Sequence, residues 1–443
     1  MKGQLYETRP LEFWQLAKDL RKQYDKSIAE KSVGERKKAL GNGTTNFVID
    51  WQQAFPAIQV AEDNPVGAMM AAQNEPFARK ARLASEARGW GREICGYHNT
   101  CWGAQFLGHT ADGKPFPERE FTVPFPCVCD SHVKRGQQCR DFKPIARWTN
   151  DFTMYIGERD EKREEALLTH RNFNTLKMLN EMEYVFGQKC DDETLFDMAK
   201  SYTELASYRR DVSYFMTFKP SPLTVKDMYS LFQLGGLAKL GPGVAANFWK
   251  QVRDEVEWRV QNKIAAVGNE RFRWIEAHPP SWHFLKYYRY MEQYGAVCLG
   301  SQYSQSTDFE VQPDGSLQVR KYPVYPTDME LTTREDVVRY MTTPDPRSPH
   351  HFKIDEYLRP YALNEFAEVY KADGALFGLW RAGVGCAISR KEQAMRLRNA
   401  GYSVMLYEGA QPGDRVDFDE KRFLEQLDTW MESLGFQMLE GGN

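Results

Sequence analysis

Residues 269–443 alternate between short apolar runs and amphipathic stretches, and no other feature of the sequence constrains the fold as strongly. Strands are predicted for the apolar runs 272–275, 296–301, 375–380 and 402–407. Helices are predicted for 282–294, 361–371, 389–399 and 420–434. Alternation of this kind is typical of βαβ units, which form a parallel sheet with right-handed crossovers.

The N-terminal part shows a weaker version of the same alternation. Residues 1–40 are predicted to be helical, because Phe13, Leu16 and Leu20 recur at spacings of three and four. Strands are predicted at 47–50, 119–125 and 152–156, and residues 53–90 are predicted to be mainly helical. A proline at position 124 places the second of these runs at a strand end.

Residues 160–265 read as long charged amphipathic helices without a strong strand signal, and we expect their charged faces to be solvated. The predicted fold class is therefore α/β, with two Rossmann- or flavodoxin-like parallel-sheet lobes joined by a helical segment. The predicted domains are 1–160 (N-terminal helix and first lobe), 161–268 (helical segment) and 269–443 (second lobe). The cleft between the lobes is the default place for a ligand.

Charge and composition exclude several classes of protein. The 58 Lys and Arg residues are balanced by 61 Asp and Glu, a net charge of −3, which does not favour binding to nucleic acid. The sequence lacks the run of about 18 apolar residues that a membrane-spanning helix needs, and its charged start lacks the apolar core of a signal peptide. Eight Cys in 443 residues are too few for a disulfide scaffold. We therefore expect a cytoplasmic protein without a membrane partner.

Three cysteines occupy loop positions at which a parallel sheet binds ligands. Cys386 follows an apolar strand and precedes a predicted helix, Cys129 follows the strand that ends in FPCVCD, and Cys95 lies in REICGYHNTCWG. A helix N-terminus favours the thiolate, which is the form that binds a metal. A single cysteine of this kind is more often a small buried hydrophobic residue. Three at comparable positions favour a shared site.

The spacing of the cysteines fits zinc poorly. Cys127 and Cys129 form only C-x-C, while Cys95 and Cys101 form C-x₅-C, and neither matches the C-x₂₋₄-C pair of zinc sites. Dispersed thiolates from different strand ends fit an iron–sulfur cluster better. Three thiolates on a four-iron cluster would leave one iron without a cysteine, and an open position of this kind is what distinguishes a catalytic metal site.

One histidine near these cysteines is a candidate proton donor. His98 follows Cys95 by three positions, the spacing at which helical side chains are neighbours. The alternative is an ordinary histidine with local hydrogen bonds. Tyr97 is the weaker candidate, because at about 100° per residue on a helix it would point well away from Cys95.

A second motif resembles a phosphate loop. The segment from Gly108 to Lys114 matches the G-x₄-G-K half of such a loop, but Pro115 follows where a Ser or Thr should hold Mg²⁺. The segment also precedes a predicted strand, and DGK is typical of a turn. We therefore do not expect this chain to hydrolyse ATP.

Several segments together resemble the benzoyl-CoA reductase / 2-hydroxyacyl-CoA dehydratase family, in the same order and over most of the chain. They are LEFWQLAKDLRKQY, EICGYHNTCWG, DGKPFPEREFTVPFPCVCDSHVK, RFRWIEAHPPSWHFLKYYRYMEQYGAVCLGSQY and ADGALFGLWRAGVGCAISRKEQAMRLRNAGYSVMLYEG. Within the family the sequence is most similar to the larger cluster-bearing subunit of the ATP-dependent (class I) benzoyl-CoA reductases, of the Azoarcus type.

The resemblance implies one 4Fe–4S cluster held by three cysteines of this chain. The family's ligands fall on Cys95, Cys129 and Cys386, with Cys127 as the competitor of Cys129. The other cysteines (Cys101, Cys139, Cys190 and Cys298) match no ligand position. Some members carry further cysteines where this chain reads MTTPDPRSPHHFKIDEYL and has none, so a cluster type that needs them is not expected.

The resemblance also implies partners and an activity. The expected partners are a related second cluster-bearing subunit, ATP-hydrolysing electron-activating subunits, ferredoxin as the upstream donor, and an aromatic acyl-CoA substrate. The first hypothesis is an oxidoreductase that reduces benzoyl-CoA, or a methylated analogue, to a cyclic dienoyl-CoA, with His98 as the catalytic proton donor. The second is a subunit of a 2-hydroxyacyl-CoA dehydratase. The third is a non-catalytic partner subunit that relays electrons or docks.

Overall fold

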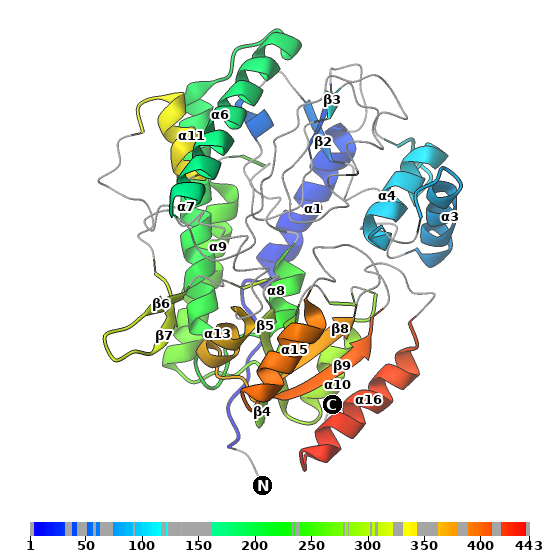
Figure 1. Cartoon of the computed structure of the whole chain (residues 1–443), viewed down its shortest axis with the longest axis vertical. Coiled ribbons are helices and arrows are strands. Elements are labelled where there is room, and N and C mark those ends of the chain that lie inside the picture. Colours follow the sequence, from blue (N-terminus) through cyan, green and yellow to red (C-terminus); the bar gives the residue numbers. More distant parts are fainter. Residues whose placement is uncertain are drawn as a thin grey trace.

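The computed structural model describes residues 4–31, 38–41, 51–55, 59–62, 74–91, 94–116, 121–122, 134, 161–232, 234, 240–241, 243–277, 280–281, 283–301, 304–305, 309–321, 331–342, 362–379, 389–409 and 418–439. Two parallel sheets, a two-stranded antiparallel sheet and the helices around them make up this part of the chain (Figure 1). The larger sheet lies toward one end of the molecule, and the hairpin of α3 (Glu75–Glu86) and α4 (Gly96–Leu107) lies to one side.

The second sheet confirms the α/β prediction. Its strands are β4 (Phe272–Ala277), β5 (Ala296–Ser301), β8 (Gly374–Leu379) and β9 (Ser403–Glu408). They are parallel and lie in the order β5-β4-β8-β9. The helices predicted beside them are α10 (Lys286–Glu292), α13 (Ala362–Val369), α15 (Arg390–Asn399) and α16 (Glu420–Ser433). Helix α10 begins later than predicted, since the chain first turns where the Phe284 amide donates to the Ser281 carbonyl.

The first sheet is small and parallel, in the order β2-β1-β3. Its strands are β1 (Lys38–Gly41), β2 (Gln59–Glu62) and β3 (Phe121–Thr122), and α1 (Trp14–Lys31) and the 3₁₀ helix η1 (Trp51–Ala54) accompany them. The helical predictions for 1–40 and 53–90 are wrong where β1 and β2 lie, because strands of four residues leave no alternating pattern to detect. The predicted strand at 119–125 is confirmed by β3, whereas those at 47–50 and 152–156 lie outside the described residues.

In its described residues, the segment predicted to be helical forms α6 (Glu161–Phe186), α7 (Asp192–Phe215), α8 (Val225–Phe232) and α9 (Val244–Gln261). Helix α7 begins where the Asp191 carboxylate accepts from the amides of Glu193 and Thr194, a standard N-cap. Not every charge in this segment faces solvent. Arg259 is buried and donates to Glu255 and to the carbonyls of Arg9 and Pro10, so it fixes the N-terminal segment.

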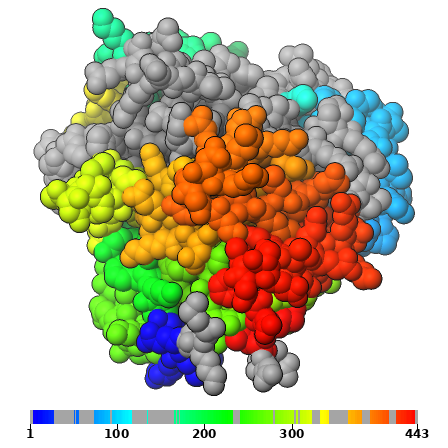
Figure 2. Space-filling view, turned by 60° about the horizontal axis from the view of Figure 1, so that its bottom comes forward, coloured from blue at the N-terminus to red at the C-terminus, as the bar shows by residue number. Residues whose placement is uncertain are grey.

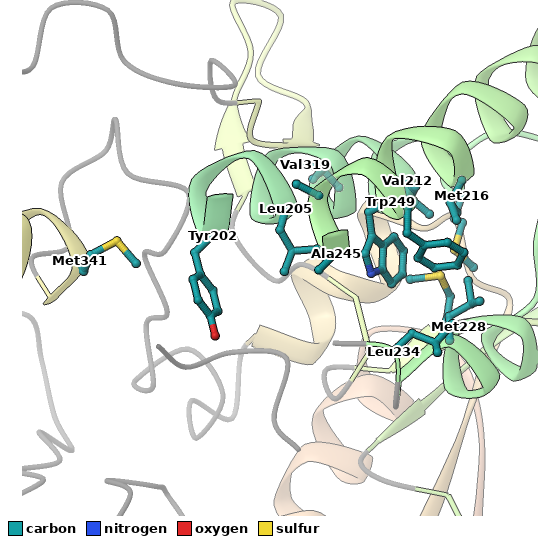
Figure 3. Close-up of a cluster of buried hydrophobic side chains, with 14 of the residues drawn as sticks. Tyr202, Leu205, Val212, Met216, Met228, Leu234, Ala245, Trp249, Val319 and Met341 are labelled. Atoms are coloured by element: carbon teal, nitrogen blue, oxygen red, sulfur yellow. The ribbon is translucent and has the colours of Figure 1, made fainter. Parts of the chain in front are cut away.

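The second sheet separates two hydrophobic layers. Ile275 and Ala277 point into a core shared with α7, α9 and α13, whereas Trp274 points into an aromatic layer formed with α8, α10 and α16. Figure 3 shows part of the shared core, where Trp249 of α9 lies near Met228 of α8 and other buried residues. Helices α7 and α9 of the 161–268 segment therefore lie on one face of the second sheet, whereas α8 contributes to the layer on the other face. The domain boundaries themselves remain a prediction.

The remaining described elements complete the shared core. They are the hairpin of β6 (Phe309–Val311) and β7 (Leu317–Val319) and helix α11 (Arg334–Thr342). The N-terminal residues lie against the end of the helical segment, where the Tyr6 amide donates to the Gly268 carbonyl; Figure 2 shows them in blue beside green residues. Among the described helices, none combines the length and apolarity that crossing a membrane requires.

Candidate functional site

The site begins with the close packing of α3 against α4. A Cβ atom at Gly103 of α4 would lie 1.6 Å from the carbonyl oxygen of Ala81 in α3. Only glycine therefore allows the two helix backbones to approach this closely. Phe77 and Trp102 fill the remaining space between the helices.

Cys95 lies at the N-cap of α4. Its backbone is extended (φ −46°, ψ 123°), its carbonyl accepts from the Asn99 amide at 2.9 Å, and its side chain is buried. The exposed amides of a helix N-terminus favour a negatively charged group such as a thiolate. The position and chemistry of Cys95 therefore fit an iron ligand.

A buried polar network holds the loop that precedes Cys95. The Ser85 hydroxyl donates to Asn99 Oδ1, while Asn99 Nδ2 donates to the carbonyls of Trp90 (3.3 Å) and Gly91 (3.2 Å). The Asn99 side chain is 1% exposed. Without it, the Ser85 hydroxyl and the two carbonyls would lose a hydrogen-bond partner that water could not replace. Asn99 thus links the end of α3, the loop and α4, and it fixes the direction from which the chain enters Cys95.

His98 and Tyr97 lie in the first turn of α4, after Cys95. The segment is helical, and the half-buried His98 ring lies 6.1 Å from the Trp102 ring. Burial raises the pKa of Tyr97 well above its ordinary value, and the thiols of Cys101 and Cys95 raise it further. Its position on the helix does not disfavour Tyr97, because Cys95 precedes the helix. The role of His98 stays a prediction.

The full ligand set lies outside what the structure describes. Cys127, Cys129 and Cys386 are not among the described residues. Within the described ranges, no three His, Cys, Asp or Glu side chains gather into a group that would hold a metal. Cys190 and Cys298 are buried, and burial raises the pKa of Cys190 to about 11 and that of Cys298 well above its ordinary value.

The segment that resembles a phosphate loop is a turn after a helix. Helix α4 ends at Gly108, and the Phe116 amide returns to the Gly108 carbonyl. Within the turn, the Thr110 hydroxyl donates to the Asp112 carboxylate, and Lys114 pairs with the same carboxylate at 2.8 Å. Lys114 therefore pairs with a residue of its own turn, which agrees with the prediction that this segment is a turn.

A second polar group lies at the carboxyl edge of the second sheet, where the sequence analysis placed no functional residue. Glu276 of β4 is 1% exposed within the aromatic layer. The Tyr287 hydroxyl donates to its Oε1 atom at 2.5 Å, and the Tyr288 hydroxyl donates to Oε2. Burial raises the pKa of Glu276 to about 8, although the two hydroxyls lower it. The signal in the sequence was a carboxylate inside an otherwise apolar strand end, WIEA.

Other polar groups lie near Glu276 on α8 and β5. The Tyr229 ring of α8 lies 6.1 Å from the Tyr288 ring, and the Tyr229 hydroxyl lies 2.7 Å from the Ser301 hydroxyl. Ser301 is the register partner of Glu276 and the last residue of β5. In an open parallel sheet, ligands bind beyond this edge.

Two comparisons with known proteins identify relatives. The family model described as "2-hydroxyglutaryl-CoA dehydratase, D-component" matches residues 63–434. The (R)-phenyllactyl-CoA dehydratase alpha subunit of Clostridium sporogenes is 22% identical over 274 residues, which cover 61% of this chain. The match spans 65% of that relative, somewhat less than two thirds of its length. Both findings favour the dehydratase hypothesis, which the sequence analysis placed second, over benzoyl-CoA reduction.

Proposed function

Because the chain belongs to the 2-hydroxyglutaryl-CoA dehydratase D-component family, we propose that it is one subunit of a 2-hydroxyacyl-CoA dehydratase. The observation that carries this proposal is the family match over residues 63–434, which includes Cys95 at the start of α4. The relative's name suggests an aromatic 2-hydroxyacyl-CoA such as phenyllactyl-CoA as the first substrate to test.

The proposed reaction eliminates water between C2 and C3 of the acyl chain. The C2–O and C3–H bonds break, a C2=C3 double bond forms, and the hydroxyl leaves with the C3 proton as water. A thioester acidifies C2–H but not C3–H, so simple base catalysis is slow. A bound iron–sulfur cluster would supply a single electron to the thioester, and that electron returns at the end of each turnover.

The residues of this chain would hold the cluster and move the protons. We propose Cys95, Cys129 and Cys386 as the thiolate ligands of one 4Fe–4S cluster, with Cys127 as the alternative to Cys129. Cys95 fits because it is the N-cap residue of α4, where a helix favours a thiolate, and because Asn99 fixes the loop before it. His98, one helical turn after Cys95, is proposed as a proton donor or acceptor on the same side.

The proposed partners follow from the family. They are a related second cluster-bearing subunit and a separate ATP-hydrolysing activator that receives its electrons from ferredoxin. Lys114 pairs with Asp112 of the same turn, which agrees with the proposal that another protein hydrolyses ATP. We propose the cytoplasm as the compartment, since a low-potential cluster is protected there from oxidation.

The test is anaerobic turnover of the chain with its second subunit and activator. We expect phenyllactyl-CoA to lose water at a rate that far exceeds electron consumption. Stoichiometric use of two electrons per product with benzoyl-CoA, and no elimination from any 2-hydroxyacyl-CoA, would contradict the proposal and restore the reductase hypothesis. The iron and labile-sulfide content of the same preparation tests the cluster separately.

A further inference from the structure

Two indole groups lie beside the start of α4. Trp102 belongs to α4 and Trp90 to the loop before Cys95, and their ring centroids are 5.2 Å apart. Trp102 is 1% exposed, and Trp90 is half-buried with its indole nitrogen shielded from solvent. Neither indole N–H has a hydrogen-bond acceptor among the residues that the structure describes. An indole N–H only donates, and it ordinarily finds an acceptor when it is buried, so both donors need an explanation.

The Trp102 indole reaches the first turn of α4. His98 precedes Trp102 by four positions, so about 40° of rotation separates the two side chains on the helix. Long helical side chains lean toward the N-terminus of their helix, and the 6.1 Å between the rings of Trp102 and His98 agrees with this direction. Trp90 contacts the same indole from the loop that leads into Cys95. The indole therefore lies beside both this loop and the turn that directly follows Cys95.

The acceptors that the described residues offer at this end of α4 have other donors. Asn99 Oδ1 accepts from the Ser85 hydroxyl, and the Gly96 carbonyl accepts from the Thr100 hydroxyl at 2.7 Å. The Cys95 sulfur is not a partner of either indole in the described part of the chain. Iron–sulfur clusters accept hydrogen bonds at their sulfur atoms, and these bonds help to set the reduction potential. A cluster at Cys95 would therefore supply the kind of acceptor that is missing.

A contact between the two rings is the competing explanation. Their planes are 64° apart, so the edge of one ring points toward the face of the other. An N–H group that points at an aromatic face makes a weak hydrogen bond. In an edge-to-face pair this contact engages one of the two N–H groups at most. It therefore leaves the other donor unexplained.

We propose that the Trp102 indole N–H donates a hydrogen bond to a sulfide of the cluster at Cys95 and thereby raises the reduction potential of that cluster. The inference rests on the proposed function, which requires the cluster. Reduction adds one negative charge, so the hydrogen bond is stronger in the reduced state and favours it. The potential determines how readily the electron passes to the thioester and how readily it returns. Trp102 acts through the cluster and is a positioning residue, and Trp90 packs against its ring.

The first experiment measures the reduction potential in the anaerobic complex of this chain with its second subunit. Trp102→Phe keeps an aromatic ring but removes the donor. We expect the equilibrium constant for reduction of the cluster at Cys95 to fall on the order of tenfold, which lowers the midpoint by about 59 mV. The iron content should stay the same.

Trp249→Phe is the matched control for this measurement. The Trp249 indole is also 1% exposed and also lacks an acceptor among the described residues, but it lies on α9 in the shared core. We expect the midpoint of this variant to equal that of the unmodified protein. An unchanged midpoint in a Trp102→Phe complex with its full iron content would overturn the proposal.

The second experiment detects the hydrogen bond in the unmodified protein, so it does not depend on the folding of a variant. Only this chain carries tryptophan labelled with ¹⁵N in the indole, and the reduced complex is studied by electron–nuclear double resonance. We expect a coupling to ¹⁵N and a coupling to a proton that disappears in D₂O. Trp102→Phe should remove both couplings, and Trp90→Phe should retain them.

The outcomes separate this inference from the proposed function. A cluster without these couplings, or couplings that Trp90→Phe removes and Trp102→Phe retains, would overturn the role of Trp102 and leave the dehydratase function intact. A complex that contains no iron or labile sulfide would refute the proposed cluster and the inference together. Couplings in a complex that eliminates water from no 2-hydroxyacyl-CoA would support the hydrogen bond and refute the function.

Discussion

At the scale of single residues, the buried thiol at the start of α4 is the most direct test of the cluster. We expect Cys95→Ser to lose iron and labile sulfide, because a serine hydroxyl does not replace a thiolate ligand. Cys190→Ser is the matched control: it changes an equally buried thiol that packs in the shared core beside Phe186 and Leu195. Iron and sulfide are counted after anaerobic preparation of the complete complex. A full cluster in Cys95→Ser would remove this residue from the ligand set.

Glu276 makes a prediction about stability that is independent of catalysis. Its pKa rises from an ordinary 4.5 to about 8 on folding, so the folded chain binds more protons than the unfolded chain between these values. The contribution of the Glu276 proton to the free energy of unfolding is therefore complete below pH 4.5 and is lost as pH rises to about 8. One proton changes the free energy of unfolding by up to about 1.4 kcal/mol per pH unit.

The measurement is denaturant unfolding of the chain at pH 6 and pH 8. We expect Glu276→Gln to lose less stability than the unmodified protein between these two values, because an amide does not titrate. Parallel pH dependence in the two proteins would mean that Glu276 is not the group that binds the proton. Tyr290→Phe serves as the control, since the Tyr290 hydroxyl donates to Asp428 and not to Glu276.

At the scale of elements, the α3–α4 hairpin depends on a single glycine. Gly103→Ala would place a methyl group against the Ala81 carbonyl, and we expect it to cost about 1–3 kcal/mol or more through overpacking. Separation of the helices would also disturb the entry to Cys95, so the iron content should fall. Gly113→Ala is the control: its cost, roughly 1–2 kcal/mol from a left-handed backbone, arises in an exposed turn and should leave iron unchanged. Equal iron content in both variants would contradict the coupling.

Elements were predictable from the sequence where they are long or fully buried. β5 and β8 show continuous apolar runs, because helices cover both faces of a parallel sheet, whereas β4 also carries Arg273 and Glu276 and β9 is partly exposed. β1 and β2 were missed, since each has four residues and lacks an alternating pattern. The spacing of Cys95 and His98 suggested that they are neighbours if the segment is helical, and the structure places Cys95 at the N-cap of α4 and His98 in its first turn. Glu276 could not be recognised, because its meaning depends on Tyr229 and Ser301, which are distant in the sequence and meet only in the folded chain.

At the scale of the whole molecule, a buried ion pair at the start of the second sheet also contacts the helical segment. Arg273 of β4 pairs with Glu270, and both are buried. Arg273 also donates to the carbonyls of Phe218 (3.1 Å), after α7, and Tyr370 (3.0 Å), after α13. Glu270 Oε2 accepts from the Ser221 amide at 2.7 Å. These contacts hold the ends of two helices on the sheet, so the 161–268 and 269–443 segments should unfold together.

The ion pair makes the last prediction. We expect Arg273→Met to lower the free energy of unfolding by about 3–5 kcal/mol, because it leaves Glu270 as an uncompensated buried charge. Adding Glu270→Gln removes that charge while keeping an acceptor for the Ser221 amide, so the double variant should be more stable than Arg273→Met alone. Urea unfolding followed by tryptophan fluorescence measures both, since Trp249 lies in the shared core and Trp274 lies in the aromatic layer. A double variant no more stable than the single one would show that Arg273 acts through its carbonyl contacts and not through the charge of Glu270.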